Sequence, residues 1–352
     1  MSLQELLTTA KAMVAEGKGL LAMDESTPTC NKRFEKVGIS QTVENRRAYR
    51  EMIVTTPGLG DFISGVILYD ETIRQSKKDG TPLINVITDA GIIPGIKVDT
   101  SAKDMALHPR EKITEGLDGL RDRLSEYSLM GARFAKWRAV IAVADGIPSR
   151  SSIEANAHAL ARYAALCQEA SLVPIVEPEV LMDGEHDLER CCRVTEEVLQ
   201  MVFNQLNTQR VMLEGMILKP SMVLPGLSCP KQESVDDVAN VTVKCLLRTV
   251  PGAVPGIAFL SGGQSAELAT ARLNAMNLRF KSRLPWALSF SFARAIQQPA
   301  LEMWHGEEAN VVAAQRALHH RAKCNHLARL GEYKDAMETE FETSEIEESR
   351  SG

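Results

Sequence analysis

VPIVEPEV (173–180), DLERCCRVTEEVLQMVFNQL (187–206) and GMILKPSMV (215–223) are the stretches that best reveal the fold of this chain. The first and third are short apolar segments bounded by Gly, Pro or polar residues, as buried strands are. The second has the apolar period of a helix. Together they predict a strand–helix–strand unit of the kind that builds parallel sheets.

Six more segments with this strand pattern lie before and after that unit. They are GLLAMD (19–24), GVILYD (65–70), IIPGIKVD (92–99), ARFAKWRAV (132–140), GIAFLSGG (256–263) and WALSFSF (286–292). Most intervening stretches are predicted helices, such as 151–170, which Ser151 or Ser152 would cap. Eight strands alternating with helices predict an α/β fold, a single-domain (β/α)8 TIM barrel. An open doubly wound sheet is the alternative, but no G-x-G-x-x-G motif follows the first strand.

Composition and charge place the chain among soluble globular proteins. Its 352 residues are 44% hydrophobic and 24% charged, and a net charge of −6 leaves no basic surplus for nucleic acid. No apolar run approaches the roughly 20 residues that span a bilayer. Glu5 and Glu16 lie among apolar residues at helical spacing, which indicates an N-terminal helix and not a signal peptide. We expect a cytoplasmic protein without a membrane partner; a processed plastid stromal protein would share these features.

The C-terminal end differs in composition from the rest. Residues 1–337 carry the barrel pattern and the N-terminal helix, whereas ETEFETSEIEESRSG (338–352) is acidic and has no apolar period. We expect a flexible tail there.

Neither the cysteines nor the histidines have the spacing of a metal site. The seven cysteines are odd in number and form no C-x-x-C, which favours reduced thiols over a disulfide framework or a zinc ribbon. None of the seven histidines ends a predicted strand, and no zincin spacing occurs. We therefore expect neither a metal nor a cofactor.

Polar residues gather where the predicted strands end, which is where TIM barrels place their catalytic groups. They are Asp24, Lys97, Lys136, Glu177, Lys219, Ser261 and, just after the last strand, Arg294. Lys219 lies in the apolar stretch ILKPSM (217–222). Desolvation and neighbouring cations lower the pKa of such a lysine, so its free amine can attack a carbonyl. Taken alone Lys219 would more readily be a structural ion-pair partner; its neighbours favour a nucleophile.

Two pairs of charged residues have the i, i+2 spacing that places both side chains on one face of a strand. Glu177 and Glu179 are suited to general acid–base work, or to ion pairs with Lys136 or Lys219. Lys136 and Arg138 would bind substrate oxygens or neutralise the two glutamates.

Phosphate-binding signals follow the last two predicted strands. SGGQS (261–265) and Arg294 occupy the loops that commonly cradle phosphate in these barrels. Lys32 and Arg33, after the first strand, would hold a second phosphate or form a solvated basic face.

The chain resembles the class I fructose-1,6-bisphosphate aldolases from about residue 10 to residue 335. It is more similar to the plastid and cyanobacterial members than to the others. The matching motifs are LAMDEST (21–27), NKRFEKVG (31–38), ENRRAYR (44–50), GIKVD (95–99), GLDGL (116–120), FAKWR (134–138), VPIVEPE (173–179), LKPSMV (218–223), FLSGGQS (259–265), LNAMN (273–277) and SFSFARA (289–295).

The resemblance implies a role for each matching residue. Lys219 would form the Schiff base, Glu177 would be the general acid–base and Glu179 the carboxylate nearby, while Asp24 and Lys136 would orient sugar hydroxyls. Substrate or phosphate binding is implied for Ser26, Arg33, Lys97, Arg138, Ser261, Gly262, Gly263, Ser291 and Arg294. Three positions depart from the family: Thr29 replaces a frequent serine, Ala293 replaces a frequent glycine, and the tyrosine that ends animal members is not found here.

The implied reaction is the reversible cleavage of fructose 1,6-bisphosphate to dihydroxyacetone phosphate and glyceraldehyde 3-phosphate. A sedoheptulose 1,7-bisphosphate aldolase or a dual-substrate enzyme is an alternative, and a non-catalytic scaffold is a less favoured one. A homotetramer without cofactor is expected from the resemblance.

Overall fold

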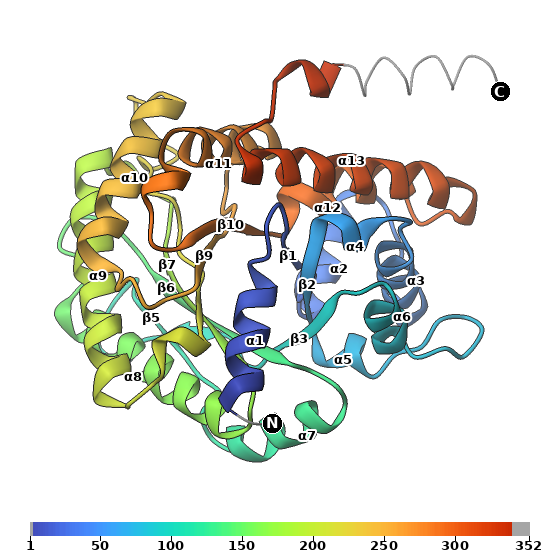
Figure 1. Cartoon of the computed structure of the whole chain (residues 1–352), viewed down its shortest axis with the longest axis horizontal. Coiled ribbons are helices and arrows are strands. Elements are labelled where there is room, and N and C mark those ends of the chain that lie inside the picture. Colours follow the sequence, from blue (N-terminus) through green and yellow to red (C-terminus); the bar gives the residue numbers. More distant parts are fainter. Residues whose placement is uncertain (1–2, 340–352) are drawn as a thin grey trace.

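Eight parallel strands form a closed barrel in the computed structural model, which describes residues 3–339 (Figure 1). The strands are β1 (Gly19–Ala22), β2 (Ile63–Leu68), β3 (Ile93–Lys97), β6 (Phe134–Ile141), β7 (Val173–Val180), β8 (Ile217–Leu218), β9 (Gly256–Phe259) and β10 (Ala287–Phe292). Their order around the barrel is the order along the chain, and β1 closes it by pairing with both β2 and β10. The predicted (β/α)8 barrel is thus confirmed.

Helices surround the barrel (Figure 1). They are α1 (Leu3–Met13), α2 (Thr27–Lys36), α3 (Val43–Val54), α4 (Leu59–Phe62), α5 (Asp70–Ile73), α6 (Leu83–Asp89), α7 (Leu120–Leu129), α8 (Arg150–Glu169), α9 (Leu188–Thr208), α10 (Val235–Thr249), α11 (Ala266–Phe280), α12 (Arg294–Trp304) and α13 (Val311–Leu330), with 3-10 turns at Leu213–Gly215, Lys281–Arg283 and Glu308–Asn310. Within residues 3–339, none of these helices is long and apolar enough to cross a membrane.

The side chains that β7 turns into the barrel change from apolar to charged along the strand. In β7, Val173 and Ile175 belong to an apolar cluster that also contains Leu6 and Met13 of α1. The next residues at the same period of two are Glu177 and Glu179. Helix α1 therefore seals the N-terminal end of the barrel, and the charged side chains are left at the C-terminal end.

Strand β8 is much shorter than the nine-residue segment predicted at 215–223. The backbone N–H of Lys219 still donates to Val176 O at 2.8 Å, but Pro220 has no N–H to continue the ladder. Pro220 instead uses its carbonyl, which accepts from Leu260 N at 3.1 Å. The ladder therefore ends at the residue that presents its amine to the barrel mouth.

Two local predictions need correction. Helix α8 is capped by Ser149, whose Oγ accepts from Ser152 N, and not by Ser151 or Ser152. The reason is a distant contact, since Glu111 accepts the backbone N–H of Ser149 at 2.7 Å. The short antiparallel pair β4 (Ala102–Asp104) and β5 (Lys112–Thr114) was not predicted, because three residues are too few for a periodic signal.

The predicted tail begins with two described residues, Glu338 and Thr339. Glu338 accepts from Tyr333 Oη at 2.9 Å, ion-pairs with Arg321 and lies 3.1 Å from His320 Nε2. The remainder of the predicted tail, 340–352, lies outside the described residues, and its flexibility stays a prediction.

Candidate active site

A cleft of about 630 Å³ opens at the C-terminal ends of the strands. Apart from Lys32, every residue predicted for catalysis or for substrate binding lines it: Asp24, Ser26, Arg33, Lys97, Lys136, Arg138, Glu177, Glu179, Lys219, Ser261, Gly262, Gly263, Ser291 and Arg294. Lys32 is not part of this lining, because successive residues of a helix point about 100° apart and its neighbour Arg33 faces the cleft. The barrel thus brings together side chains that are widely separated in sequence.

Two lysines share one carboxylate at the floor of the cleft. Lys136 Nζ lies 2.9 Å from Glu177 Oε2 and 3.0 Å from Asp24 Oδ2. Lys219 Nζ lies 3.3 Å from Glu177 Oε1. The side chains of Lys136, Glu177 and Lys219 are only 5%, 4% and 4% exposed, so these charges interact with little screening by water.

The same burial affects the two lysines differently. Burial lowers the pKa of Lys219, and the charge of Lys136 lowers it further, while Glu177 and Asp24 oppose this only in part. Burial also acts against the charged form of Lys136, but the attraction of Asp24 and Glu177 is greater and raises its pKa above the ordinary value. Lys219 is therefore the amine that loses its proton more readily, and Lys136 stays an ammonium ion.

Asp24 stays ionised although it is buried. Burial alone would raise its pKa, but Lys136, Lys219 and Lys97 hold that pKa below its ordinary value. Asp24 is therefore a fixed negative charge beside the two lysines, not a proton donor.

A second set of ion pairs lies along the wall next to this floor. Arg138 ion-pairs with Glu179, and its backbone N–H donates to Asp99 Oδ2 at 3.3 Å. Asp99 also lies 2.8 Å from Lys97 Nζ. Sequence reasoning did not assign Asp99 a role, although its place after the end of β3 was a usable signal.

The loops after β9 and β10 meet at one side of the cleft. The exposed guanidinium of Arg294 donates to Gly262 O. Gly262 has φ +58°, a backbone conformation that favours glycine. Ser291 Oγ is buried and has no hydrogen-bond partner within the described part of the chain. A glycine turn, an arginine and the start of α12 are features that bind anions in other proteins.

Ala293, which replaces a glycine frequent in the resembled family, lies beside these features at the start of α12. It is the N-cap of α12 with φ −107° and ψ −87°, outside the positive-φ region that favours glycine. Its methyl group packs against the apolar cluster inside the barrel while the residue lines the cleft.

A buried carboxylate supports the rim of the cleft after β1, the strand that pairs with β10. Glu25 pairs with Arg33 and lies 2.7 Å from Arg50 Nη2, and Gln297 Nε2 donates to it at 3.0 Å. Ser26 Oγ and Thr29 Oγ1 are 3.0 Å apart at the same rim. Glu25 and Arg50 were missed by sequence reasoning, since Glu25 lies in the loop before α2, Arg50 lies on α3 and no local pattern connects the two.

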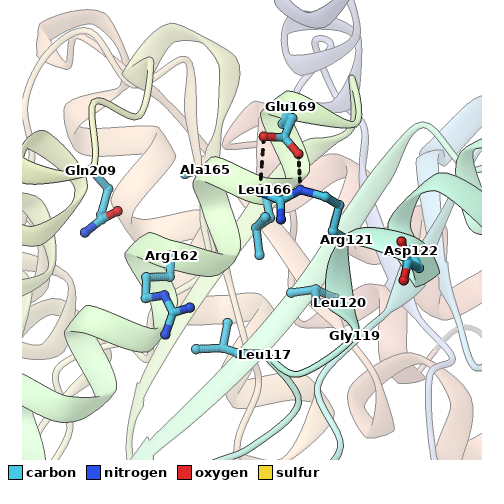
Figure 2. Close-up of a pocket in the computed structure, with 10 residues that line it drawn as sticks. All are labelled: Leu117, Gly119, Leu120, Arg121, Asp122, Arg162, Ala165, Leu166, Glu169 and Gln209. Atoms are coloured by element: carbon cyan, nitrogen blue, oxygen red, sulfur yellow. Dashed lines mark hydrogen bonds and ion pairs between the residues drawn. The ribbon is translucent and has the colours of Figure 1, made fainter.

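A second hollow, of about 450 Å³, lies beside α7 and α8 (Figure 2). Its main charged contact is the pair Arg121–Glu169 at 2.6 Å, whose side chains are 66% and 57% exposed. Exposed pairs of this kind contribute little, and no buried titratable group lines the hollow. The described residues that line this hollow therefore offer no candidate catalytic group.

Comparison with known proteins identifies the family of the chain. The model of the glycolytic, class I fructose-bisphosphate aldolase family matches residues 5–350. A probable class 1 fructose-bisphosphate aldolase of Xanthomonas campestris is 59% identical over 95% of this chain and 100% of its own length. A cytosolic aldolase of Arabidopsis thaliana is 51% identical over 94% of this chain and 92% of its length.

The fold comparison gives the same result. The fructose-bisphosphate aldolase of Plasmodium falciparum, solved in complex with TRAP and a small-molecule inhibitor, superposes with a TM-score of 0.92 at 48% identity. The match covers 94% of this chain and 95% of that one. With a whole-length family match, full-length relatives and a shared barrel, this chain belongs to the class I fructose-bisphosphate aldolase family.

Proposed function

We propose that this chain cleaves fructose 1,6-bisphosphate reversibly into dihydroxyacetone phosphate and glyceraldehyde 3-phosphate, through a Schiff base on Lys219. The observation that carries the assignment is the floor of the cleft. There a buried lysine with a lowered pKa lies 3.3 Å from a carboxylate that is itself paired with a second lysine. Amine, acid and fixed charges are the groups that imine chemistry requires.

The first half of the reaction builds the imine. The neutral amine of Lys219 attacks carbon 2 of the open-chain sugar and forms a carbinolamine. Glu177, which lies 3.3 Å from Lys219 Nζ, takes the proton that Lys219 loses and gives it to the carbinolamine hydroxyl, which leaves as water, and an iminium ion remains. Lys136 and Asp24 stay charged throughout and hold Glu177 in place.

The second half breaks the carbon–carbon bond. Glu177, now a carboxylate, accepts the proton of the carbon 4 hydroxyl, and the electrons of the bond between carbons 3 and 4 pass to the iminium. Glyceraldehyde 3-phosphate leaves and an enamine remains on Lys219. Protonation at carbon 3 and hydrolysis then release dihydroxyacetone phosphate and regenerate the amine.

Phosphate binding is proposed for the two sides of the cleft. Ser261, Gly262, Ser291 and Arg294 would hold one phosphate, and Ser26 and Arg33 would line the other end. Arg138 and Lys97 supply further positive charge along the wall between them. Holding both phosphates would fix the reacting carbons over Lys219.

Steady-state kinetics test the proposal. Fructose 1,6-bisphosphate and sedoheptulose 1,7-bisphosphate are compared in parallel, each with and without EDTA. The proposal predicts turnover of the fructose substrate that is unchanged by EDTA, because the iminium serves as the electron sink. A folded chain with no turnover of either sugar would favour the scaffold alternative.

The assembly and the compartment are part of the same proposal. We propose a homotetramer in the cytoplasm, in keeping with the family membership and with the cytosolic relative. Light scattering coupled to size-exclusion chromatography measures the assembly, and fractionation of the source cells measures the compartment.

A further inference from the structure

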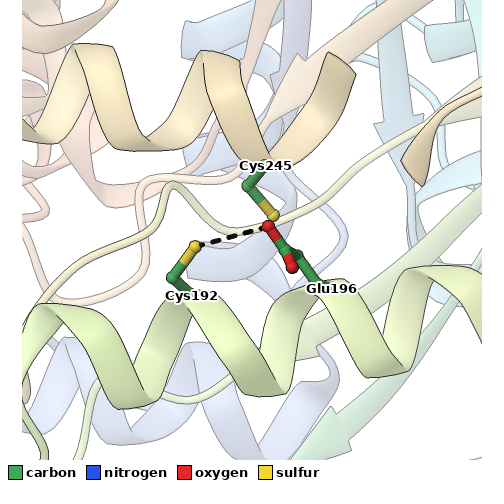
Figure 3. Close-up of side chains that lie close together, drawn as sticks. All are labelled: Cys192, Glu196 and Cys245. Carbon is green, nitrogen blue, oxygen red and sulfur yellow. Dashed lines mark hydrogen bonds between the residues drawn. The ribbon is translucent and has the colours of Figure 1, made fainter. Parts of the chain in front are cut away.

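Two cysteines and a glutamate meet on the outside of the barrel, between α9 and α10 (Figure 3). Cys192 and Glu196 lie one helical turn apart on α9, and Cys245 faces them from α10. Cys192 Sγ lies 3.8 Å from Glu196 Oε1. The two sulfur atoms and a carboxylate oxygen all lie within 4.8 Å of one another.

We propose that Cys192, Glu196 and Cys245 bind a divalent ion of the zinc group. Tetrahedral Zn²⁺ has bonds of about 2.3 Å to sulfur and about 2.0–2.2 Å to oxygen, so its ligand atoms lie roughly 3.5–3.8 Å apart. The separations within the trio need only a small contraction to reach that geometry. Thiolate ligands select zinc over magnesium or calcium.

Charge balance supports a divalent ion at this place. Arg248 Nη1 lies 2.9 Å from Glu196 Oε1. A rotation of the carboxylate leaves one oxygen for Arg248 and the other for the metal, which is the usual outer-shell arrangement of a ligating carboxylate. The two thiolates and the carboxylate are then neutralised by the divalent ion together with the guanidinium.

The trio also has a rigid frame and a route of entry. Both helices are regular through the ligand positions. Cys245 is buried, whereas Cys192 and Glu196 line a surface hollow of about 560 Å³ from which a water molecule can supply the fourth ligand. A bound ion would clamp α9 to α10, and because the trio is not part of the catalytic cleft, removal of the ion should leave sugar cleavage intact.

A second trio, His320, Cys324 and Glu338, serves as an internal control. Both oxygens of Glu338 are already used, since Arg321 and Tyr333 bind one and His320 lies 3.1 Å from the other. This trio is a complete hydrogen-bonded network without a metal. The two trios therefore predict opposite results in a binding experiment.

Cobalt spectroscopy tests the proposal on the full chain, kept reduced with a phosphine. Addition of Co²⁺ should produce the visible bands of a tetrahedral ion and the ultraviolet thiolate-to-metal band, saturating at a single ion per chain and displaced by Zn²⁺. In C192S the affinity should fall at least about 100-fold, since loss of even an outer-shell partner costs 10- to 100-fold. C245S should behave like C192S, and E196Q should bind more weakly.

Two matched variants serve as controls in which Co²⁺ binding should be unchanged. C229S and C324S remove cysteines outside the trio and should bind Co²⁺ as the parent chain does. Absence of tetrahedral bands in the reduced parent chain, bands unchanged in C192S, or bands lost in C324S would each overturn the assignment. If C245S does not fold, the result for C192S decides, because Cys192 is only partly buried whereas Cys245 is fully buried.

Discussion

Lys219 at the end of β8 and Lys136 in β6 are both buried and both contact Glu177, yet their pKa values shift in opposite directions. The difference lies in the number of carboxylates. Lys136 lies within 3.0 Å of two carboxylates, Asp24 and Glu177, whereas Lys219 lies 3.3 Å from Glu177 and is attracted by Asp24 from farther away. Burial by itself therefore does not make a lysine nucleophilic; burial with too little compensating negative charge does.

The largest expected effect comes from removing the lysine with the lowered pKa. K219R keeps a positive charge but no free amine, so fructose 1,6-bisphosphate cleavage should fall on the order of 10⁴-fold or more. Turnover measured with a coupled assay gives the result. K97R is the matched control on the same cleft, and a loss in K97R as large as in K219R would remove the distinction.

Removal of the shared carboxylate should have the next largest effect. E177Q keeps the shape but neither donates nor accepts the proton, so kcat should fall about 10³-fold with a much smaller change in KM. E177Q also removes the charge that raises the pKa of Lys219, and that pKa should fall further. If kcat is retained, Glu177 is only a structural partner of the two lysines.

Removal of the permanently charged lysine should have a smaller effect on rate and a visible one on pH dependence. In K136M, kcat should fall about 10²-fold, because Glu177 and Asp24 lose their common partner. Protonated Lys219 is inert, so trapping by borohydride should decline as pH falls through its pKa, which lies below the ordinary 10.5. Lys136 lowers that pKa, so the midpoint should move to higher pH in K136M. A midpoint that moves to lower pH would contradict the account; circular dichroism confirms the fold.

The smallest effect is expected outside the lysine pair. R294A removes one guanidinium at the proposed phosphate site, so KM should rise about tenfold while kcat changes little. The pH midpoint of trapping at Lys219 should stay unchanged, which separates substrate binding from activation of the amine. A large fall in kcat with KM unchanged would instead place Arg294 in the chemical step.

The sequence predicted the barrel and the members of the cleft well, because both depend on local pattern. β7 begins and ends where the apolar segment does, and Glu177 and Glu179 have the spacing that places both inside. Polar residues at strand ends were sufficient to assemble the candidate site, since a parallel barrel collects those ends at one mouth.

What the sequence could not predict depends on contacts between distant segments. The pairing of Glu25 with Arg50, and the choice of Ser149 as the cap of α8, are decided by residues on other elements. The opposite pKa shifts of Lys219 and Lys136 depend on their distances to the carboxylates. The sequence places both lysines at strand ends near glutamates and does not give these distances. The trio on α9 and α10 was missed for the same reason: its cysteines are separated in sequence and form no metal motif.

Borohydride trapping identifies directly which of the two buried lysines forms the imine with substrate. The folded chain is incubated with dihydroxyacetone phosphate and sodium borohydride, digested, and mapped by mass spectrometry. Because the pKa of Lys219 is lowered and that of Lys136 is raised, we expect a reduced adduct on the peptide that contains Lys219 and none on the peptide that contains Lys136. An adduct on Lys136, or an active chain with Lys219 unmodified, would contradict it.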